Sequence, residues 1–303
     1  MGVFYSMTNI PYLGEGLALL TALTWGCAVI LFKKSGETVH PIALNLFKDV
    51  LAFLLFIPTM WVFQEQMLPT VSDKVLWRLI LSGILGIAIA DTLFFYSLQR
   101  LGAGRVAIIS CLYSPFVITV SYYSLNESLR WLQILGVITI VAAVFLATFR
   151  RGEQVITKRN LITGLLFGIM ATIATGAGIV LMKPHLSDFS LLWVSEVRLA
   201  AGIIVLILLV ALHPQRRAIV GSLAIKEGRI YTVWGSFVGA YLSLIPWLGG
   251  FKFTQVSIAA GLHQTSSLFV FILASIFLKE RITLPKGIGI VLAVSGVYLI
   301  TFG

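Results

Sequence analysis

The chain has 303 residues, of which 58% are hydrophobic and only 11% are charged, and its mean hydropathy is +0.99. A soluble domain has about a quarter of its residues charged, so the composition excludes a soluble globular protein and predicts an integral membrane protein. The formal net charge is +10, but the basic residues occur in short links between apolar stretches, where they orient membrane spans. We therefore expect no nucleic-acid partner.

Ten stretches are long and apolar enough to cross a bilayer as helices, each of which needs about 20 residues. The links between them are short, so we expect no extramembrane domain. The longest link, 212–230, carries several basic residues and is expected to be a solvated loop. In chain order the predicted spans cover residues 14–33, 41–63, 76–98, 104–125, 131–149, 161–182, 190–212, 230–251, 256–278 and 283–302.

The two halves of the chain repeat each other. A shift of 150 residues places Lys48 on Arg198, and a shift of 153 residues places Glu127 on Glu280. A repeat that covers the whole chain determines the architecture, because each copy is expected to fold as the same unit.

This repeat divides the chain into a first five-helix unit at 14–149, a linker at 150–160 and a second five-helix unit at 161–303. The predicted fold is an all-α integral membrane protein with ten transmembrane helices. An odd number of spans in each unit makes the second copy enter the membrane from the opposite side, which gives inverted repeats. Fifteen Lys and Arg residues follow odd-numbered spans, against five at the termini and in the other links, and this bias predicts that the first set is cytoplasmic.

Charged side chains inside the predicted spans are candidates for function, because a charge in the hydrocarbon region of a membrane is costly. Lys48 and Asp91 are expected at similar depths, roughly 10–12 Å from the same surface at about 1.5 Å per residue, so an ion pair between them is possible. Glu196 and Arg198 are two residues apart and do not share a helix face. The five charged residues are Lys48 and Asp49 in the second span, Asp91 in the third, and Glu196 and Arg198 in the seventh.

The repeat gives two of these charges a context. Arg198 matches Lys48 but is expected in the opposite half of the membrane, and its alternative role is a structural tether to a carbonyl group or a helix end. Asp91 is matched by Leu244, so Asp91 is a candidate for handling a substrate or a coupling proton. The alternative is that Asp91 only neutralises Lys48.

Aromatic and amide side chains inside the spans complete the candidate site. Aromatic rings can hold an amine or the apolar part of a solute, although packing or interfacial anchoring is the alternative for each of them. A polar run at 263–267 lies deep in the ninth span, and part of it is expected to face water or a solute because burying it in lipid is costly. These candidates are Trp25, Tyr96, Tyr113, Trp247, His263 and Gln264.

Two short links that contain glutamate, Asn126-Glu127-Ser128 and Lys279-Glu280-Arg281, each join the last two spans of a unit. Trp25-Gly26 lies in the first span, and Pro115 precedes Glu127 by twelve residues. With ten spans in two copies, this arrangement resembles the drug/metabolite transporter superfamily and, within it, the EamA-type permeases. One departure is Leu268, where the second copy lacks the proline of the first. The resemblance implies a secondary carrier for small organic metabolites such as amino acids or amines, often an exporter.

We therefore expect a secondary transporter, not an enzyme, that exports an amino acid or an amine by alternating access. The intramembrane charges, three acidic and two basic, also favour zwitterionic or amine solutes. The alternatives are a phosphate-ester or nucleotide-sugar exchanger of the same superfamily, an intramembrane enzyme in which His263 acts with Ser110 or Ser114, and a scaffold that transports nothing.

The expected partners are the small-molecule substrate, the lipid bilayer and, in a gradient-driven mechanism, protons. The chain is expected to be a monomer or a weak dimer in a bacterial inner membrane. The sequence has no Gly-rich phosphate-binding run and no His, Cys, Asp or Glu cluster with metal-ligand spacing, so we expect no cofactor and no metal.

Overall fold

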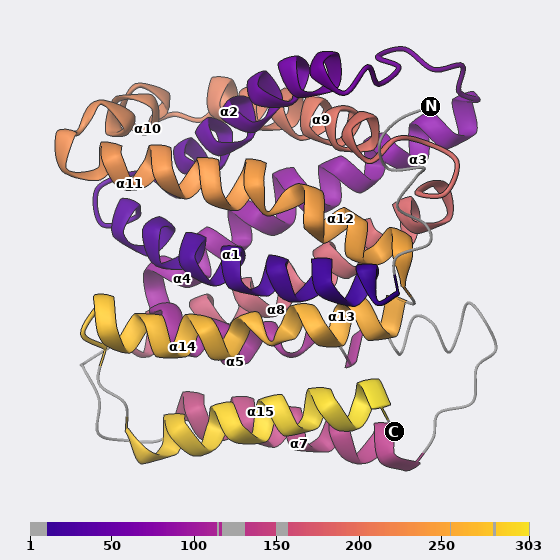
Figure 1. Cartoon of the computed structure of the whole chain (residues 1–303). Coiled ribbons are helices and arrows are strands. Elements are labelled where there is room, and N and C mark those ends of the chain that lie inside the picture. Colours follow the sequence, from indigo (N-terminus) through magenta and orange to yellow (C-terminus); the bar gives the residue numbers. More distant parts are fainter. Residues whose placement is uncertain are drawn as a thin grey trace.

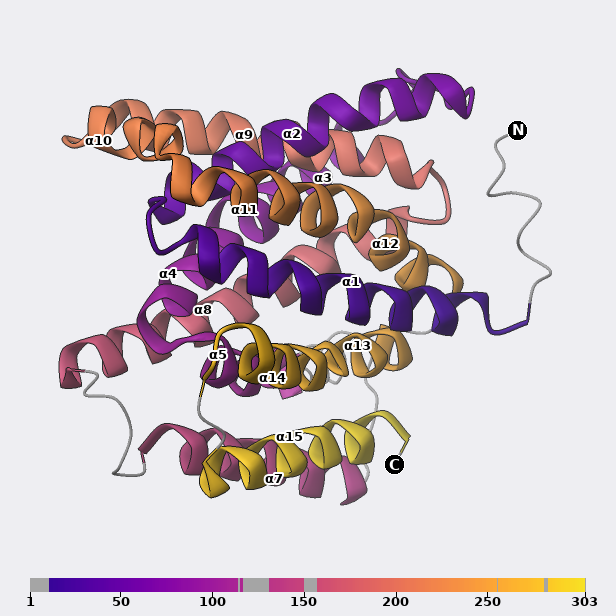
Figure 2. The ribbon, with the colours of Figure 1, turned by 60° about the vertical axis from the view of Figure 1, so that its left-hand side comes forward.

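The computed structural model describes residues 11–113, 115–116, 131–149, 157–254, 256–280 and 283–302. Within these ranges every regular element is a helix (Figures 1 and 2). Two shorter apolar helical stretches are Ile134–Ala143 and Leu284–Leu299, so the count of ten spans stays a prediction. Six helices of the described ranges are long and apolar enough to cross a membrane, namely Leu13–Ser35, Pro41–Val62, Asp73–Leu101, Lys158–His185, Leu191–Leu212 and Ile258–Phe277.

The helices follow the order of the predicted spans. The first half contains α1 (Leu13–Ser35), α2 (Pro41–Val62), α3 (Asp73–Gly83), the π-helix η2 (Ile84–Ala90), α4 (Asp91–Leu101), α5 (Ala103–Ser110) and α7 (Trp131–Phe149). The second half contains α8 (Lys158–Met182), the 3-10 helix η3 (Lys183–His185), α9 (Leu191–Leu212), α10 (Arg216–Gly221), the 3-10 helix η4 (Ser222–Ala224), α11 (Lys226–Ser236), the π-helix η5 (Phe237–Leu242), α12 (Leu244–Phe253), α13 (Val256–Gln264), α14 (Ser266–Phe277) and α15 (Leu284–Phe302).

Two predicted elements differ from the structure or lie outside it. The link at 212–230, expected as a loop, contains the short helices α10 and η4. Ile219 of α10 is buried in the core and Leu223 of η4 packs against the same core, while Arg216 and Arg217 are exposed. These apolar contacts dock the two short helices against the bundle. The link around Glu127 and most of the linker at 150–160 lie outside the described residues.

Matching elements of the two halves carry the same irregularity. The π-helix η2 begins at Ile84 and η5 begins at Phe237, 153 residues later. Packing between the halves is also reciprocal: α1 packs against α11 and α12, while α8 packs against α3 and α4. The helix α2 packs against its counterpart α9, and α7 packs against its counterpart α15. These reciprocal contacts are those of a two-repeat bundle.

The helices α7 and α15 lie side by side at one edge of the molecule in both views (Figures 1 and 2). The remaining helices form the larger part of the bundle. Its outer faces expose large apolar side chains such as Leu54, Ile204 and Leu208. Lipid chains can cover these apolar faces. The helix backbone tolerates lipid as well, because its polar groups are hydrogen-bonded within the helix.

A glutamate of the second half fixes the start of a helix in the first half. The carboxylate of Glu280 accepts hydrogen bonds from the backbone N–H of Ala103 at 2.9 Å and of Gly104 at 3.1 Å. Gly102, which precedes α5, has a φ of 83°, a left-handed conformation that glycine adopts without strain. An anion at a helix N-terminus satisfies free N–H groups and the helix dipole, so Glu280 ties α5 to the end of α14.

Candidate functional site

A cavity of about 210 Å³ lies inside the bundle and is lined by both halves of the chain. The first half contributes side chains from α1, α2, η2, α4, α5 and the residues after α5. The second half contributes side chains from α8, α9, η5, α12, α13 and α14. Among the described side chains, no lining residue comes from α7 or α15, so this part of the edge pair does not contribute to the cavity.

A buried asparagine on α2 positions the acidic start of α4. Asn45 Nδ2 donates hydrogen bonds to the carbonyl of Ile87 at 2.9 Å and to Thr92 Oγ1 at 3.0 Å. Ile87 lies in the π-helix η2, a type of irregularity that often marks functional sites in helices. Lys48 follows Asn45 by one turn on α2, on the same face of the helix. The tie from Asn45 therefore brings Asp91, the first residue of α4, next to Lys48.

Lys48 is neutralised by two carboxylates. Its Nζ atom lies 2.5 Å from Asp49 Oδ1 and 2.8 Å from Asp91 Oδ2. The side chains of Lys48 and Asp49 are 4% and 1% exposed, whereas that of Asp91 is 25% exposed and borders the cavity. The predicted contact between Lys48 and Asp91 is present in the structure. Asp49 is a second partner, so one cation lies between two anions.

Arg198 on α9 has a different environment. The residue is only 3% exposed, yet its Nε and Nη1 atoms have no hydrogen-bond partner among the described residues. In the same part of the chain, no carboxylate oxygen lies within 4.0 Å of the guanidinium group, although Asp91 attracts it from farther away. The guanidinium carbon lies over the Trp247 ring, 5.4 Å from the ring centroid.

Two glycines allow the third span to approach α9 at Arg198. A Cβ atom on Gly83 would collide with the carbonyl oxygen of Arg198, and a Cβ atom on Gly86 would lie 3.0 Å from its Nη2 atom. Only a residue without a side chain fits at Gly83, because the obstacle is backbone. The close approach holds Arg198 against η2, the segment that directly precedes Asp91.

The repeat explains why Lys48 has close carboxylate partners and Arg198 has none within the described ranges. Shifts of 150 and 153 residues place Leu199 on Asp49 and Leu244 on Asp91, and both leucines line the cavity. The second half therefore keeps the cation but replaces both of its carboxylates with apolar side chains.

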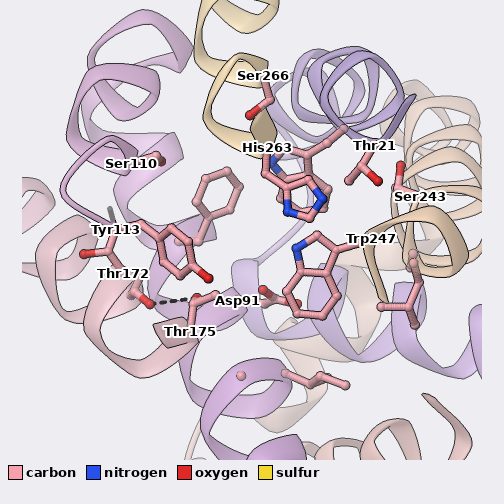
Figure 3. Close-up of a pocket in the computed structure, with 18 of the residues that line it drawn as sticks. Thr21, Asp91, Ser110, Tyr113, Thr172, Thr175, Ser243, Trp247, His263 and Ser266 are labelled. Atoms are coloured by element: carbon pink, nitrogen blue, oxygen red, sulfur yellow. Dashed lines mark hydrogen bonds between the residues drawn. The ribbon is translucent and has the colours of Figure 1, made fainter. Parts of the chain in front are cut away.

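Three aromatic side chains complete the polar end of the cavity. The rings of Trp247 and His263 are stacked, with centroids 6.4 Å apart and an angle of 20° between the planes. His263 is buried and neither of its ring nitrogens has a hydrogen-bond partner within the described ranges, and the same holds for the hydroxyl of Tyr113. Figure 3 shows Tyr113, Asp91, Trp247 and His263 directed toward one space. The walls thus present several unused hydrogen-bonding atoms.

Eight of the nine predicted site residues line this cavity, and their part in binding stays a prediction. They are Trp25, Lys48, Asp91, Tyr113, Arg198, Trp247, His263 and Gln264.

Tyr96 lies elsewhere, in a cluster that contributes nothing to the cavity lining. Its hydroxyl lies 3.5 Å from His40 Nε2, and the Arg100 guanidinium lies over its ring at 5.2 Å. Tyr96 follows Asp91 by five residues, which places it on a different face of α4 because a helix has about 3.6 residues per turn.

Several lining residues were not among the predicted site residues. Asp49 was recognised only as an intramembrane charge, although its position beside Lys48 was visible. Gly168, Thr172 and Thr175 share one face of α8, and this spacing of small and polar residues was the available signal. Glu196 does not line the cavity. The charged residues that line it within the described ranges are two acidic and two basic, so their formal charges sum to zero.

Among the described residues, the structure shows no contact between His263 and a serine of the kind that the enzyme alternative requires. His263 forms no hydrogen bond to Ser110 or to any other described residue, and Ser114 lies outside the described residues. No group of His, Cys, Asp or Glu side chains within the described ranges is placed to hold a metal ion.

Comparison with known proteins finds relatives that are named as transporters. A curated relative from Methanothermobacter thermautotrophicus, called an uncharacterized transporter, is 25% identical over 94% of this chain and 85% of its own length. The uncharacterized transporter YoaV of Bacillus subtilis is 22% identical over 92% of this chain and 94% of its own length. One solved crystal structure has a TM-score of 0.65 at 16% identity, covering 93% of this chain and 95% of its own, so the fold is shared.

The sequence model of one family matches this chain twice, at residues 12–149 and 162–302, which confirms the resemblance that the sequence motifs indicated. Relatives and family alike are transporters and not enzymes. With its apolar helices, the chain is a multi-pass integral membrane protein, and a bacterial inner membrane fits it. The chain belongs to the EamA-like transporter family.

Proposed function

We propose that this transporter is a secondary carrier that exports a small organic metabolite, an amino acid or an amine, by alternating access. The observation that carries the proposal is the internal cavity that both halves of the chain line. Its matched cations, Lys48 and Arg198, stand on counterpart helices α2 and α9, which pack against each other. A site at the interface of two repeats is the arrangement that alternating access requires.

Two matched lysines support a mechanism with two equivalent ends. Lys33 Nζ donates hydrogen bonds to the carbonyls of Leu98 at 3.1 Å and Gln99 at 3.2 Å, near the end of α4. Lys183, which a shift of 150 residues places on Lys33, donates to the carbonyls at the end of α12. A cation at a helix C-terminus is favourable. With inverted repeats, these two ties would lie at opposite surfaces of the membrane.

The Lys48 cluster supports proton coupling. Two carboxylates share one ammonium group, so the cluster carries an extra negative charge when both are ionised. Arg198 offsets this charge only from beyond ion-pair distance. A charge without a close partner is costly inside a membrane, so binding one proton stabilises the cluster. Asp91 is the more accessible of the two carboxylates and borders the cavity, so it is the group that we expect to exchange the proton.

The alternative phosphate-ester or nucleotide-sugar exchanger has less support. A phosphate dianion inside a membrane requires at least two available positive charges for neutralisation. Lys48 is already held by Asp49 and Asp91, which leaves Arg198 as the available cation among the residues lining the cavity.

The test is flux in proteoliposomes with an imposed proton gradient. Radiolabelled amino acids and amines are loaded, and wild-type protein is compared with Asp91→Asn. Arg217→Ala, at an exposed position of α10, is the matched control. We expect gradient-driven flux in the wild type and the control, whereas Asp91→Asn retains solute exchange and loses the response to the gradient. No flux of any amino acid or amine by wild-type protein would contradict the proposed substrates, and a full gradient response in Asp91→Asn would contradict the coupling.

A further inference from the structure

We propose that Arg198 is the anchor for a carboxylate group of the transported solute, so that organic carboxylates are substrates and amines without a carboxylate are not. This inference rests on the proposed function, because it names the substrate class of the same cavity. It narrows the amino acids and amines of that proposal to molecules that bring an acidic group.

Arg198 lacks a close counter-charge among the described residues. Lys48 has two carboxylates within 2.8 Å, whereas buried Arg198 has none within 4.0 Å among the described residues, and Asp91 attracts it only from farther away. The chain places Leu199 and Leu244 where the other half has its acids. A buried charge without a partner is strongly unfavourable, so an anion that enters the cavity gains at Arg198 what the protein itself does not supply.

Arg198 has hydrogen-bond donors that no described residue uses. The guanidinium of Arg198 lies over the Trp247 ring, and its Nε and Nη1 atoms have no partner among the described residues. These two atoms are therefore available to a ligand. On each outward edge of a guanidinium, an N–H of Nη2 lies parallel to an N–H of Nε or of Nη1, and such a pair matches the two oxygens of a carboxylate. An ammonium or a neutral amide makes no equivalent contact with this fork.

Other residues of the cavity would contact the solute carboxylate and the apolar part of the solute. The Tyr113 hydroxyl and the His263 ring add hydrogen-bonding atoms that no described residue uses. A carboxylate accepts about four hydrogen bonds, so these groups can share it with Arg198. Trp25 and Phe94 also line the cavity and provide apolar surface for the rest of the solute.

Asp91 decides how much of an amino acid the site recognises. Its side chain is partly exposed to the cavity but is already paired with Lys48. A solute ammonium can share Asp91, but this carboxylate does not depend on it for neutralisation. We therefore expect a carboxylate to be required and an ammonium group to be tolerated.

The experiment measures the melting temperature of detergent-purified protein with ligands that differ only in the head group. One series is phenylalanine, 3-phenylpropanoate, phenylalanine amide and phenethylamine, and a second series carries an isobutyl body. Short fatty acids, keto acids and dicarboxylates widen the panel. We expect the carboxylates to raise the melting temperature and the amides and amines to leave it unchanged. Stabilisation by amines or amides equal to that by the acids, or by no carboxylate of the panel, would overturn the proposal.

Variants identify the anchor. Arg198→Lys keeps the charge but loses the fork, and we expect it to weaken carboxylate binding at least tenfold, with a larger loss in Arg198→Gln. Arg217→Gln is the exposed control with unchanged binding. Leu244→Asp is the second test if Arg198→Gln does not fold, because an internal carboxylate at that position competes with the solute for Arg198. Carboxylate binding of wild-type strength in Arg198→Gln, or in Leu244→Asp, would refute the assignment.

Binding and flux separate this inference from the proposed function. Carboxylate binding that requires Arg198, without flux in proteoliposomes, would leave the anchor standing and contradict the carrier mechanism. Flux of an amine that persists in Arg198→Gln would leave the carrier standing and contradict the anchor.

Discussion

Lys48 and Arg198 occupy matching positions in the two halves of the chain, but only one of them is neutralised by the protein. Lys48 contacts two carboxylates, whereas the Arg198 guanidinium lies over the Trp247 ring and has unpartnered donors within the described part of the chain. The difference comes from the residues that match Asp49 and Asp91, which are leucines in the second half. The repeated scaffold therefore provides two cations, and a few substitutions make one structural and the other available to a ligand.

Removing the cation of the neutralised half is expected to have the largest effect. Lys48→Met leaves Asp49 and Asp91 without a partner, and breaking a buried ion pair in this way costs about 3–5 kcal/mol of stability. The free energy of unfolding in mixed detergent micelles measures the loss. The triple variant Lys48→Met/Asp49→Asn/Asp91→Asn should recover most of it, because it removes the stranded charges. A single variant as stable as wild type would show that Lys48 does not neutralise the cluster.

The same substitution in the other half should act in the opposite direction. Arg198→Met removes a buried cation that has no carboxylate partner, so we expect stability to rise by about 1–2 kcal/mol, limited by the loss of a cation–π contact of similar size. The same unfolding measurement is used, with Arg217→Met as the exposed control. A variant less stable than wild type would mean that the protein satisfies Arg198 by itself, and the contrast between the halves would disappear.

Making the second half resemble the first should weaken ligand binding. In Leu244→Asp the new carboxylate occupies the position equivalent to Asp91, and we expect carboxylate affinity to fall at least tenfold, which corresponds to about 1.4 kcal/mol. Isothermal titration of the purified protein measures the affinity, and Leu244→Asn is the matched neutral control. If both variants lose affinity equally, the cause is polarity rather than charge.

The smallest expected effect concerns a feature in which the halves agree. Lys33 and Lys183 both donate to carbonyls at the end of a counterpart helix. Because a cation at a helix C-terminus contributes about 0.3–1 kcal/mol, Lys33→Met and Lys183→Met should each lower stability by that amount and by nearly the same amount. Thermal unfolding of both variants in one detergent makes the comparison. Unequal losses would show that the two ends are not built alike.

Much of the architecture could be predicted because the apolar spans are visible in the local sequence and the repeat is visible when the two halves are compared. The contact between Lys48 and Asp91 followed from their depths in adjacent spans. Depth along a helix is nevertheless only one coordinate, and the other is the helix face. Tyr96 lies five residues after Asp91 on α4 and contacts His40 and Arg100 instead of lining the cavity.

Other parts of the site carry no local signal. Trp247 lies 49 residues after Arg198 on a different helix, and their contact depends on how α9 and α12 pack. The π-helices η2 and η5 have the composition of ordinary apolar helix, and only the hydrogen bond from Asn45 to Ile87 identifies the role of the first. The sequence also does not show which of the two cations lacks a close counter-charge, because this depends on the contacts that Lys48 and Arg198 make in the fold.

The tie from Glu280 to the start of α5 bears on the mechanics of transport. It joins a helix of one repeat to the end of a helix of the other by two charge-assisted hydrogen bonds. If each repeat moved as a rigid body, every cycle would break this connection and rebuild it. If instead α5 and α14 travelled together, the connection would persist while the other helices shifted around it. The bodies that rock against each other would then be mixed units assembled from both repeats, so the boundary of motion would not coincide with the boundary of duplication.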